Sequence, residues 1–288
     1  MPKAANGPPV EGWAEVRDLR VHYLDWGGSG PPVLALHGLA SSAHWYDLVA
    51  PLLRERYRIV APDQRGHGRT TQPPTGYDWR SLSSDVVGLM DRLGISRAVV
   101  MGHSWGANVA VNVAADFPER VDSLVLIDGG FFTPRLGVAS TWEQFSARLA
   151  PRTVSGTRDD YLAQARAQLS MCWSSEVERI VLTMVYEDAR GQMQDILRPE
   201  NQAQVIRAMW DEPAADTWPR IVCRTLIVAA GASGDGANTE FAAMRRRMVE
   251  AAAQAIKDVE ARWIPETIHD IGYHKPAELA DIIRGFLR

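Results

Sequence analysis

The sequence predicts an α/β fold: a mostly parallel, twisted β-sheet flanked by helices, with a helical segment inserted between two of its strands. Short runs rich in β-branched residues alternate with longer segments of helical periodicity, the order that produces a parallel sheet covered on both faces. Several of these runs are apolar throughout, as strands buried on both faces are. With 288 residues, 46% of them hydrophobic, the chain can bury one large core.

The expected elements follow one another in a regular order. The expected strands are residues 20–24, 33–37, 58–62, 98–102, 123–128, 225–230 and 262–265. The expected helices are residues 45–53, 81–93, 105–117, 241–256 and 276–287. Each strand candidate is shorter than every helix candidate, which is the difference in length that separates the two structures. No internal repeat or low-complexity tract interrupts them.

Residues 131–218 interrupt this alternation and define the expected domain organisation. We interpret the stretch as several amphipathic helices rich in Arg, Gln and Trp, with no convincing strand. It would form a helical cap, with residues 1–130 and 219–288 as the core domain. The tryptophans of the stretch are Trp142, Trp173, Trp210 and Trp218. Aromatic residues above a site favour an apolar pocket, although packing of the cap on the core would account for most of them.

Composition argues against several classes of partner. The net charge of −4 arises from 31 basic and 35 acidic residues spread along the chain, without the basic stripe that a nucleic acid requires. Two cysteines, Cys172 and Cys223, are too few and too far apart for a disulfide framework or a metal site. No apolar run has the pattern of a secretory signal or approaches the ~20 residues of a membrane span. We therefore expect a soluble, cytoplasmic protein that binds neither nucleic acid nor a membrane.

A G-x-S-x-G motif, Gly102-His103-Ser104-Trp105-Gly106, follows an expected strand and precedes an expected helix. At such a turn the backbone of the serine is strained, and its hydroxyl projects above the sheet at a helix N-terminus. Side chains two residues before and two residues after would clash there, which explains the glycines. A chance match in a loop would lack this context. Ser104 is therefore the candidate nucleophile.

Two loops at strand ends are expected beside the nucleophile. The sequence HGL at 37–39 ends one strand, where a backbone N–H could meet the negative oxygen of a tetrahedral intermediate. Leu39 and Trp105 are the candidate donors for this oxyanion hole. His37 itself could act as a base, but a histidine in this place more often braces the loop. The loop 63–68, with sequence DQRGHG, suits a tight turn whose charges pair locally.

Together these motifs resemble the α/β-hydrolase superfamily, and in particular its serine esterase and lipase-like branch with a helical cap. The resemblance rests on His37-Gly38, the loop 63–68, the motif at 102–106 and a late His269-Asp270. It covers nearly the whole chain outside the inserted segment, and it is specific for fold but only weakly specific for substrate. It implies a triad of Ser, acid and His in that chain order, without a metal or an organic cofactor.

The resemblance implies a general base late in the chain. His269 follows the last expected strand and precedes the final helix, which begins near Pro276. His274 is the nearest competitor, but it lies two residues before Pro276 and is assigned to the entry of that helix. Of the remaining histidines, we interpret His22, His44 and His67 as surface or turn residues. His103 is the variable residue of the G-x-S-x-G turn that carries Ser104, which we call the elbow.

The acid of the triad has two candidates, and the sequence leaves both open. Asp128 ends the strand after the nucleophile helix, 24 residues beyond Ser104, where haloalkane dehalogenases and some lactonases carry their acid. Asp235 lies in the glycine-rich loop 231–236 after a later strand, where most of the superfamily carries it. That loop is longer than the usual form, which weakens its hold on a histidine. We therefore prefer Asp128, with Asp235 as the alternative.

These residues predict acyl transfer, in which Ser104 attacks a carbonyl and His269 shuttles the proton. The expected substrate is a small, partly apolar ester or related acyl compound. Carbon–carbon bond, lactone or amide hydrolysis and hydroxynitrile cleavage could use the same residues, and a ligand receptor on a hydrolase scaffold is the non-enzymatic alternative. Haloalkane dehalogenases and epoxide hydrolases are disfavoured, since they carry an aspartate at the elbow. The sequence leaves the physiological substrate and the oligomeric state open.

Overall fold

The fold is built on an eight-stranded sheet. A computed structural model describes the chain except for residues 1–6, 135, 137–138, 140, 151–153 and 232–238. The strands are β1 (Val10–Val16), β2 (Leu19–Asp25), β3 (Pro32–Leu36), β4 (Arg58–Pro62), β5 (Ala98–His103), β6 (Val121–Ile127), β9 (Arg224–Ala230) and β10 (Val259–Ile264). Their order in the sheet is β1-β2-β4-β3-β5-β6-β9-β10, and all neighbours from β4 onward are parallel. The predicted α/β class with a mostly parallel sheet is confirmed.

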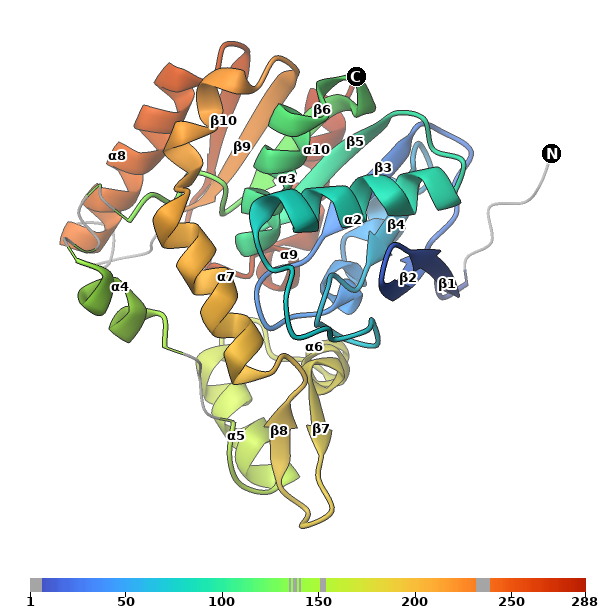
Figure 1. The fold of residues 1–288 in the computed structure, drawn as a ribbon, viewed down its shortest axis with the longest axis vertical. Helices are drawn as coiled ribbons and strands as arrows, with labels where there is room; N and C mark the ends of the chain where they lie inside the picture. Colours follow the sequence, from blue (N-terminus) through green and yellow to red (C-terminus); the bar gives the residue numbers. More distant parts are fainter. Residues whose placement is uncertain (1–6, 135, 137–138, 140, 151–153, 232–238) are drawn as a thin grey trace.

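Helices cover both faces of this sheet (Figure 1). They are α1 (Ala50–Leu53), α2 (Trp79–Arg92), α3 (Trp105–Asp116), α8 (Glu240–Ala255), α9 (Ile271–His274) and α10 (Pro276–Phe286). Successive side chains of a strand point to opposite faces. Ile127 of β6 therefore belongs to the same buried cluster as Ile283 of α10. Leu126, its neighbour in sequence, belongs with Val109 of α3 to the cluster on the other face.

The segment between β6 and β9 stands apart from the sheet. It contains α4 (Trp142–Arg148), α5 (Arg158–Gln168), α6 (Ser175–Val181), α7 (Pro199–Asp211) and a two-stranded hairpin of β7 (Val185–Glu187) and β8 (Met193–Asp195). Figure 1 shows α5, α6 and the hairpin projecting from the body of the molecule, while α7 runs back toward the sheet. The hairpin corrects our expectation of a segment without strands. Each of its strands has three residues, too few to show an alternating pattern.

β1 and the helix expected at 45–53 also differ from the sequence prediction. β1, which was not expected, pairs antiparallel with β2 at the edge of the sheet, and only Ala14 and Val16 of it are buried. The helix expected at 45–53 is instead a 3₁₀ turn (Ala43–Tyr46) followed by α1. Pro51 lies in the first turn of α1, where a residue without an N–H fits, and it interrupts any helix that arrives from before it.

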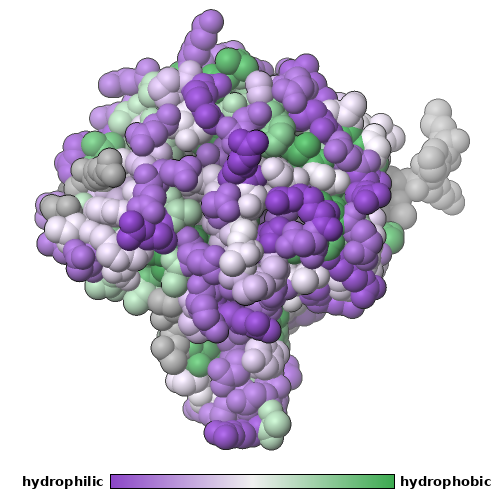
Figure 2. Space-filling view, viewed as in Figure 1, coloured by the Kyte–Doolittle hydropathy of each residue, from purple (hydrophilic) through white to green (hydrophobic). Residues whose placement is uncertain are grey.

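Polar side chains cover most of the face shown in Figure 2, and the apolar residues on it are scattered. Exposed apolar residues in small numbers are normal on a globular protein. Among the described residues, no helix is long and apolar enough to cross a membrane. The cysteines, Cys172 and Cys223, are both free.

Candidate active site

The turn between β5 and α3 holds Ser104 in a conformation that few residues adopt. Its φ is +54° and its ψ is −121°, and α3 begins at the next residue. A Cβ atom at Gly102 would lie 2.3 Å from the carbonyl oxygen of Gly106, and one at Gly106 would lie 2.3 Å from that of His37. Both approaches are far shorter than a carbon–oxygen contact allows. The glycines of the motif are therefore required by backbone packing around the serine.

Ser104, His269 and Asp128 lie together at the carboxyl ends of the parallel strands. The Ser104 Oγ is 2.9 Å from the His269 Nε2, and the His269 Nδ1 is 2.6 Å from the Asp128 Oδ2. A carboxylate only accepts hydrogen bonds, so the Nδ1 carries the proton and the Nε2 presents a lone pair to the hydroxyl. The Asp128 side chain is 1% exposed, whereas half of the His269 side chain is accessible. This is the arrangement that a serine nucleophile and its base require.

The carboxylate of Asp128 is fixed by two elements, β9 and α8. The backbone N–H of Ala230, at the end of β9, donates to the Oδ1 over 2.8 Å. Arg245 of α8 forms an ion pair with the same oxygen. The backbone of Asp128 itself has a positive φ of +46°. The Oδ2 is thereby left for His269.

The electrostatics of the pair favour a negative Asp128 beside a basic His269. Burial would raise the pKa of Asp128, but the hydrogen bond and charge of His269 and the charge of Arg245 outweigh burial and hold the pKa below its usual range. Loss of solvent lowers the pKa of His269, but the hydrogen bond and charge of Asp128 outweigh this effect, and the pKa lies above its usual range. His269 is thus a stronger base than a free imidazole.

The sequence offered one alternative for the acid, Asp235, and one for the base, His274. Asp235 lies outside the described residues. His274 belongs to α9, and its Nδ1 is 3.0 Å from the Thr267 Oγ1, which ties it to the loop before that helix. It does not line either cavity that reaches Ser104.

Leu39 and Trp105, the predicted oxyanion donors, both border Ser104. They line the same cavity as Ser104, and a Cβ atom at Gly38 would lie 3.2 Å from the Ser104 Cβ. Trp105 is the first residue of α3, where a helix leaves its backbone N–H groups without intrahelical partners. Neither backbone N–H has an acceptor among the hydrogen bonds of the described residues. Both groups are available to an oxyanion.

Two buried histidines brace the loops beside the serine. The His37 Nε2 accepts a hydrogen bond from the backbone N–H of Gln64 over 3.0 Å, as expected for a loop-bracing residue. The His67 Nε2 accepts from the backbone N–H of Ala40 over 3.1 Å. Burial and the charge of His37 lower the pKa of His67 to about 3, so it stays neutral and keeps its acceptor. His22 and His67 are each 1% exposed. Because His22 is also part of strand β2, our interpretation of it as a surface or turn residue was wrong.

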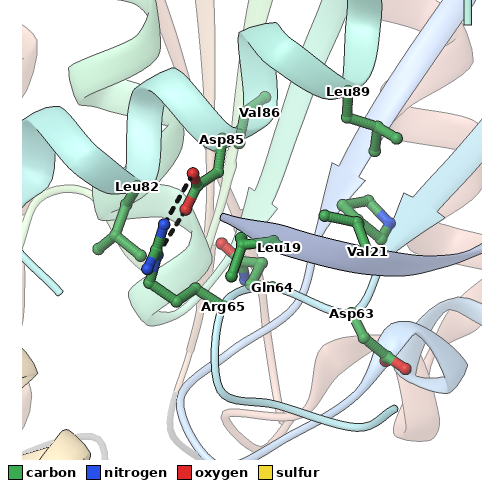
Figure 3. Close-up of a pocket in the computed structure, with 10 residues that line it drawn as sticks. Leu19, Val21, Asp63, Gln64, Arg65, Leu82, Asp85, Val86 and Leu89 are labelled. Carbon is green, nitrogen blue, oxygen red and sulfur yellow. Dashed lines mark hydrogen bonds and ion pairs between the residues drawn. The ribbon is translucent and has the colours of Figure 1, made fainter. Parts of the chain in front are cut away.

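We had expected the charges of the loop 63–68 to pair locally, but they pair with residues distant in sequence. Figure 3 shows Arg65 directed at Asp85 of α2, and Asp63 turned away from it. The Arg65 Nε is 2.7 Å from the Asp85 Oδ2, and the guanidinium also binds Asp18. Asp63 accepts a hydrogen bond from the backbone N–H of Ala43 over 2.8 Å. The cavity beside these residues measures about 20 Å³, room for a water molecule at most.

Two larger cavities meet at Ser104 and His269. The first measures about 630 Å³. Its apolar lining consists of Leu39, Trp105, Phe131, Phe132, Leu149, Met209, Phe241, Met244, Met248 and Ile268. The second measures about 180 Å³ and has a more polar wall, which includes Ser41, His103 and Asp270. A substrate could therefore place an apolar group in the first cavity with its reacting bond at Ser104.

The four tryptophans of the inserted segment do not line either cavity. Trp142 and Trp210 pack together with Phe145, at ring separations of 5.4 to 6.4 Å. Trp218 is buried and donates its Nε1–H to the carbonyl oxygen of Gly130. The apolar wall of the larger cavity is formed by other residues, mainly phenylalanine, methionine and leucine. The tryptophans themselves serve packing.

Sequence reasoning missed three residues around the site. His103 donates its Nε2–H to the carbonyl oxygen of His269 over 3.1 Å, and Trp45 stacks on its ring at 4.0 Å. Burial and the charge of His269 lower the pKa of His103 to about 4, so the ring is neutral. Arg245 is the third. Its signal in the sequence was its place on α8 between Phe241 and Met248, where the helical period puts a charged residue in an apolar stripe.

Comparison with known proteins identifies relatives of this arrangement. The family described as alpha/beta hydrolase fold matches residues 31–222. Over 115 residues the chain is 38% identical to the soluble epoxide hydrolase of Corynebacterium sp. (strain C12), a match that spans 40% of each protein. Over 107 residues it is 40% identical to the 2-(acetamidomethylene)succinate hydrolase of Mesorhizobium japonicum (strain LMG 29417 / CECT 9101 / MAFF 303099), across 37% of each. Each match thus spans about two fifths of the relative's length.

A solved structure extends the likeness to the whole fold. The crystal structure of E-2-(acetamidomethylene)succinate hydrolase superposes with a TM-score of 0.76 and 21% sequence identity. The superposition covers 97% of this chain and 99% of that one. At this level of identity the likeness concerns the fold and leaves the substrate open.

Proposed function

The chain belongs to the α/β-hydrolase fold family, and on that premise we propose that it is a serine hydrolase that cleaves a carboxylic ester or a related acyl bond. The observation that carries the proposal is the continuous hydrogen-bonded chain from the Ser104 Oγ through His269 to Asp128, with distances of 2.9 and 2.6 Å. A serine hydroxyl is a weak nucleophile until a neighbouring base takes its proton. This chain supplies both the base and the carboxylate that orients it.

In the proposed reaction the Ser104 Oγ attacks the substrate carbonyl while the His269 Nε2 takes the hydroxyl proton. The backbone N–H groups of Leu39 and Trp105 stabilise the negative oxygen of the tetrahedral intermediate. The intermediate collapses when the bond to the leaving alcohol breaks and His269 returns the proton to that oxygen. A water molecule, deprotonated by His269, then attacks the acyl-enzyme and releases the carboxylic acid and Ser104.

The serine at the elbow also bears on the choice among the family's reactions. Epoxide hydrolases and haloalkane dehalogenases carry an aspartate at the elbow, where this chain has Ser104. A serine hydroxyl that opened an epoxide or displaced a halide would form an alkyl ether, which has no carbonyl carbon for water to attack. Similarity to an epoxide hydrolase is therefore compatible with acyl chemistry in this chain.

We also propose that residues 131–218 form a cap domain over a core of residues 1–130 and 219–288. Phe132, Leu149 and Met209 of the segment line the larger cavity together with Ser104. A substrate bound there would touch both parts. The cap would thus select the apolar group of a small substrate, while the core carries out the reaction.

A fluorophosphonate probe tests the proposed function directly, because it phosphonylates a serine only when a base activates the hydroxyl. We expect one probe molecule per chain, located on Ser104 when the peptides are analysed by mass spectrometry. No probe should be attached after heat denaturation. A panel of p-nitrophenyl esters, with a matched lactone and anilide, should then show preferential turnover of esters with an apolar acyl group. A folded protein that neither takes up the probe nor turns over any member of the panel would overturn the proposal.

A further inference from the structure

We propose that Arg245 is a positioning residue of the site: it holds the oxygen of Asp128 that His269 does not use and limits how much negative charge the imidazole experiences. The proposal rests on the proposed function, since it concerns the base of that reaction. Arg245 lies on α8, 117 residues beyond Asp128 in the chain. Its role therefore comes from the packing of α8 against the strand ends.

The two oxygens of the Asp128 carboxylate have separate partners. The Oδ1 binds the Arg245 guanidinium and the backbone N–H of Ala230, and the Oδ2 binds the His269 Nδ1. With two donors on one oxygen, the carboxylate cannot rotate without losing both. The Oδ2 thus keeps a fixed direction toward His269. A single hydrogen bond to the imidazole would not enforce that direction.

Arg245 also compensates the charge of a carboxylate that is almost fully buried. The Asp128 side chain is 1% exposed and that of Arg245 is 18% exposed. When His269 is neutral, as it must be to accept the serine proton, Arg245 is the only cation paired with Asp128 among the ion pairs of the described residues. A buried anion without a partner is costly and tends to take up a proton. Arg245 keeps Asp128 ionised at that stage.

The same cation acts against protonation of His269. The groups that face His269 are Asp128 after β6, Asp270 beside it in sequence, Arg245 from α8 and the neutral His103 at the end of β5. The two carboxylates raise the pKa of His269 and Arg245 lowers it. Without Arg245 the imidazole would face uncompensated negative charge and would stay protonated up to a higher pH.

The register of α8 explains how a cation reaches this place. Phe241, Met244 and Met248 line the larger cavity from the same helix, and Arg245 lies among them. Thr239 caps the helix by accepting a hydrogen bond from the backbone N–H of Ala242, which fixes where the helix begins. The Arg245 guanidinium is 6.0 Å from the centre of the Phe241 ring. The Arg245 side chain is only 18% exposed, so solvent screens its charge less than that of a fully exposed arginine.

The test compares charge removal at Arg245 with charge removal elsewhere on the same helix. Arg245→Met removes charge and hydrogen bonds, Arg245→Gln keeps a donor but removes the charge, and Arg245→Lys keeps the charge. Arg247→Met is the matched control, because Arg247 is an exposed residue of α8 and its loss changes the net charge equally. Thermal unfolding identifies variants that fold.

The readout is the titration of the His269 ring, followed by its Hε1 resonance, which is identified by its absence in His269→Gln. We expect the midpoint to rise by about one pH unit in Arg245→Met and Arg245→Gln, since a nearby charge shifts a pKa by that order. It should stay close to the wild-type value in Arg245→Lys and Arg247→Met. The wild-type midpoint itself should exceed the ~6.5 of a free histidine.

The pH dependence of fluorophosphonate labelling at Ser104 should shift in the same direction, since the reactive form has a neutral His269. An unchanged or lower titration midpoint in a folded Arg245→Gln would overturn the proposal, and so would a change confined to the KM for anionic esters. That last outcome would make Arg245 a substrate-binding residue. The NMR titration needs no substrate, so it still tests Arg245 if the wild-type protein proves inactive toward the probe.

Discussion

The two sides of the larger cavity are built in contrasting ways. On the core side, Asn108 is 3% exposed, and its amide oxygen accepts a hydrogen bond from the backbone N–H of Gly130. Asp128, on the same side, is held by α8 and β9. On the side of the inserted segment, Phe132, Leu149 and Met209 are partly exposed apolar residues. The side chains of the proposed triad are thus held by polar networks, and we propose that the apolar wall of the inserted segment adapts to a ligand.

The largest effect should follow from removing the nucleophile on the core side. Ser104→Ala should lower kcat for the best ester by ~10⁴-fold or more, because removal of a triad member has that effect. The fold should be retained, since the elbow accepts a small residue. Steady-state kinetics together with thermal unfolding measure both quantities. If a pure, folded variant kept more than about a hundredth of kcat, another residue would have to be the nucleophile.

His269→Ala should be about as damaging as the serine substitution, whereas His274→Ala should be mild. Of these two histidines, His269 contacts the Ser104 hydroxyl, and His274 is bound to Thr267 and lines neither cavity. The ratio of kcat/KM between the two variants and the wild type is the measurement, with circular dichroism as the check on folding. The reverse ranking would move the base to His274.

Asp128→Asn should have the next largest effect. The amide cannot stabilise the imidazolium and favours the wrong tautomer, so kcat should fall by ~10⁴-fold with little change in substrate binding. Asp235→Asn, the corresponding change at the alternative acid, should keep most of the activity. Stability must be measured as well, because Asp128 also binds Arg245 and Ala230. A folded Asp235→Asn that loses activity, beside an active Asp128→Asn, would assign the acid to the later loop.

The smallest effect is expected on the adaptable side. Met209→Ala should enlarge the cavity and shift the preferred acyl chain toward longer groups, by about tenfold in relative kcat/KM, with little change for the shortest esters. Met171→Ala is the matched control, because Met171 lies in the same inserted segment but is exposed and lines neither cavity. Equal ester profiles for both variants would show that this wall does not select the substrate.

The sequence predicted best what depends on local geometry. Gly102 is demanded by the carbonyl of Gly106, within the same turn, whereas Gly106 is demanded by the carbonyl of His37, which directly follows the neighbouring strand β3. Both glycines belong to one short motif, so the pattern alone indicated the turn and its position between a strand and a helix. The catalytic roles of Ser104, His269 and Asp128 stay predictions, although the structure brings these side chains together. The choice between the two acids could not be made from the sequence, because it depends on which strand ends lie closest to His269.

What the sequence missed arises either from long-range packing or from strands with a weak or very short pattern. Arg245 and Asp128 meet only because α8 packs beside the ends of β6 and β9, a relation that no local pattern encodes. β1 was overlooked because its outer residues are exposed and its alternation is weak. The hairpin of β7 and β8 depends on backbone pairing between very short runs. Arg245 and Asp128 are 117 residues apart, whereas both hairpins, β1-β2 and β7-β8, pair segments that are close in sequence.

The positive φ of Ser104 has a consequence for how this chain can evolve. Such a conformation disfavours serine relative to glycine, by ~1–3 kcal/mol. A library selected only for survival of heating should therefore enrich glycine at position 104, and on the proposed function the selected variants would be inactive. Laboratory evolution of a heat-resistant catalyst from this sequence needs selection for turnover in every round, because heat resistance and catalysis favour different residues at position 104.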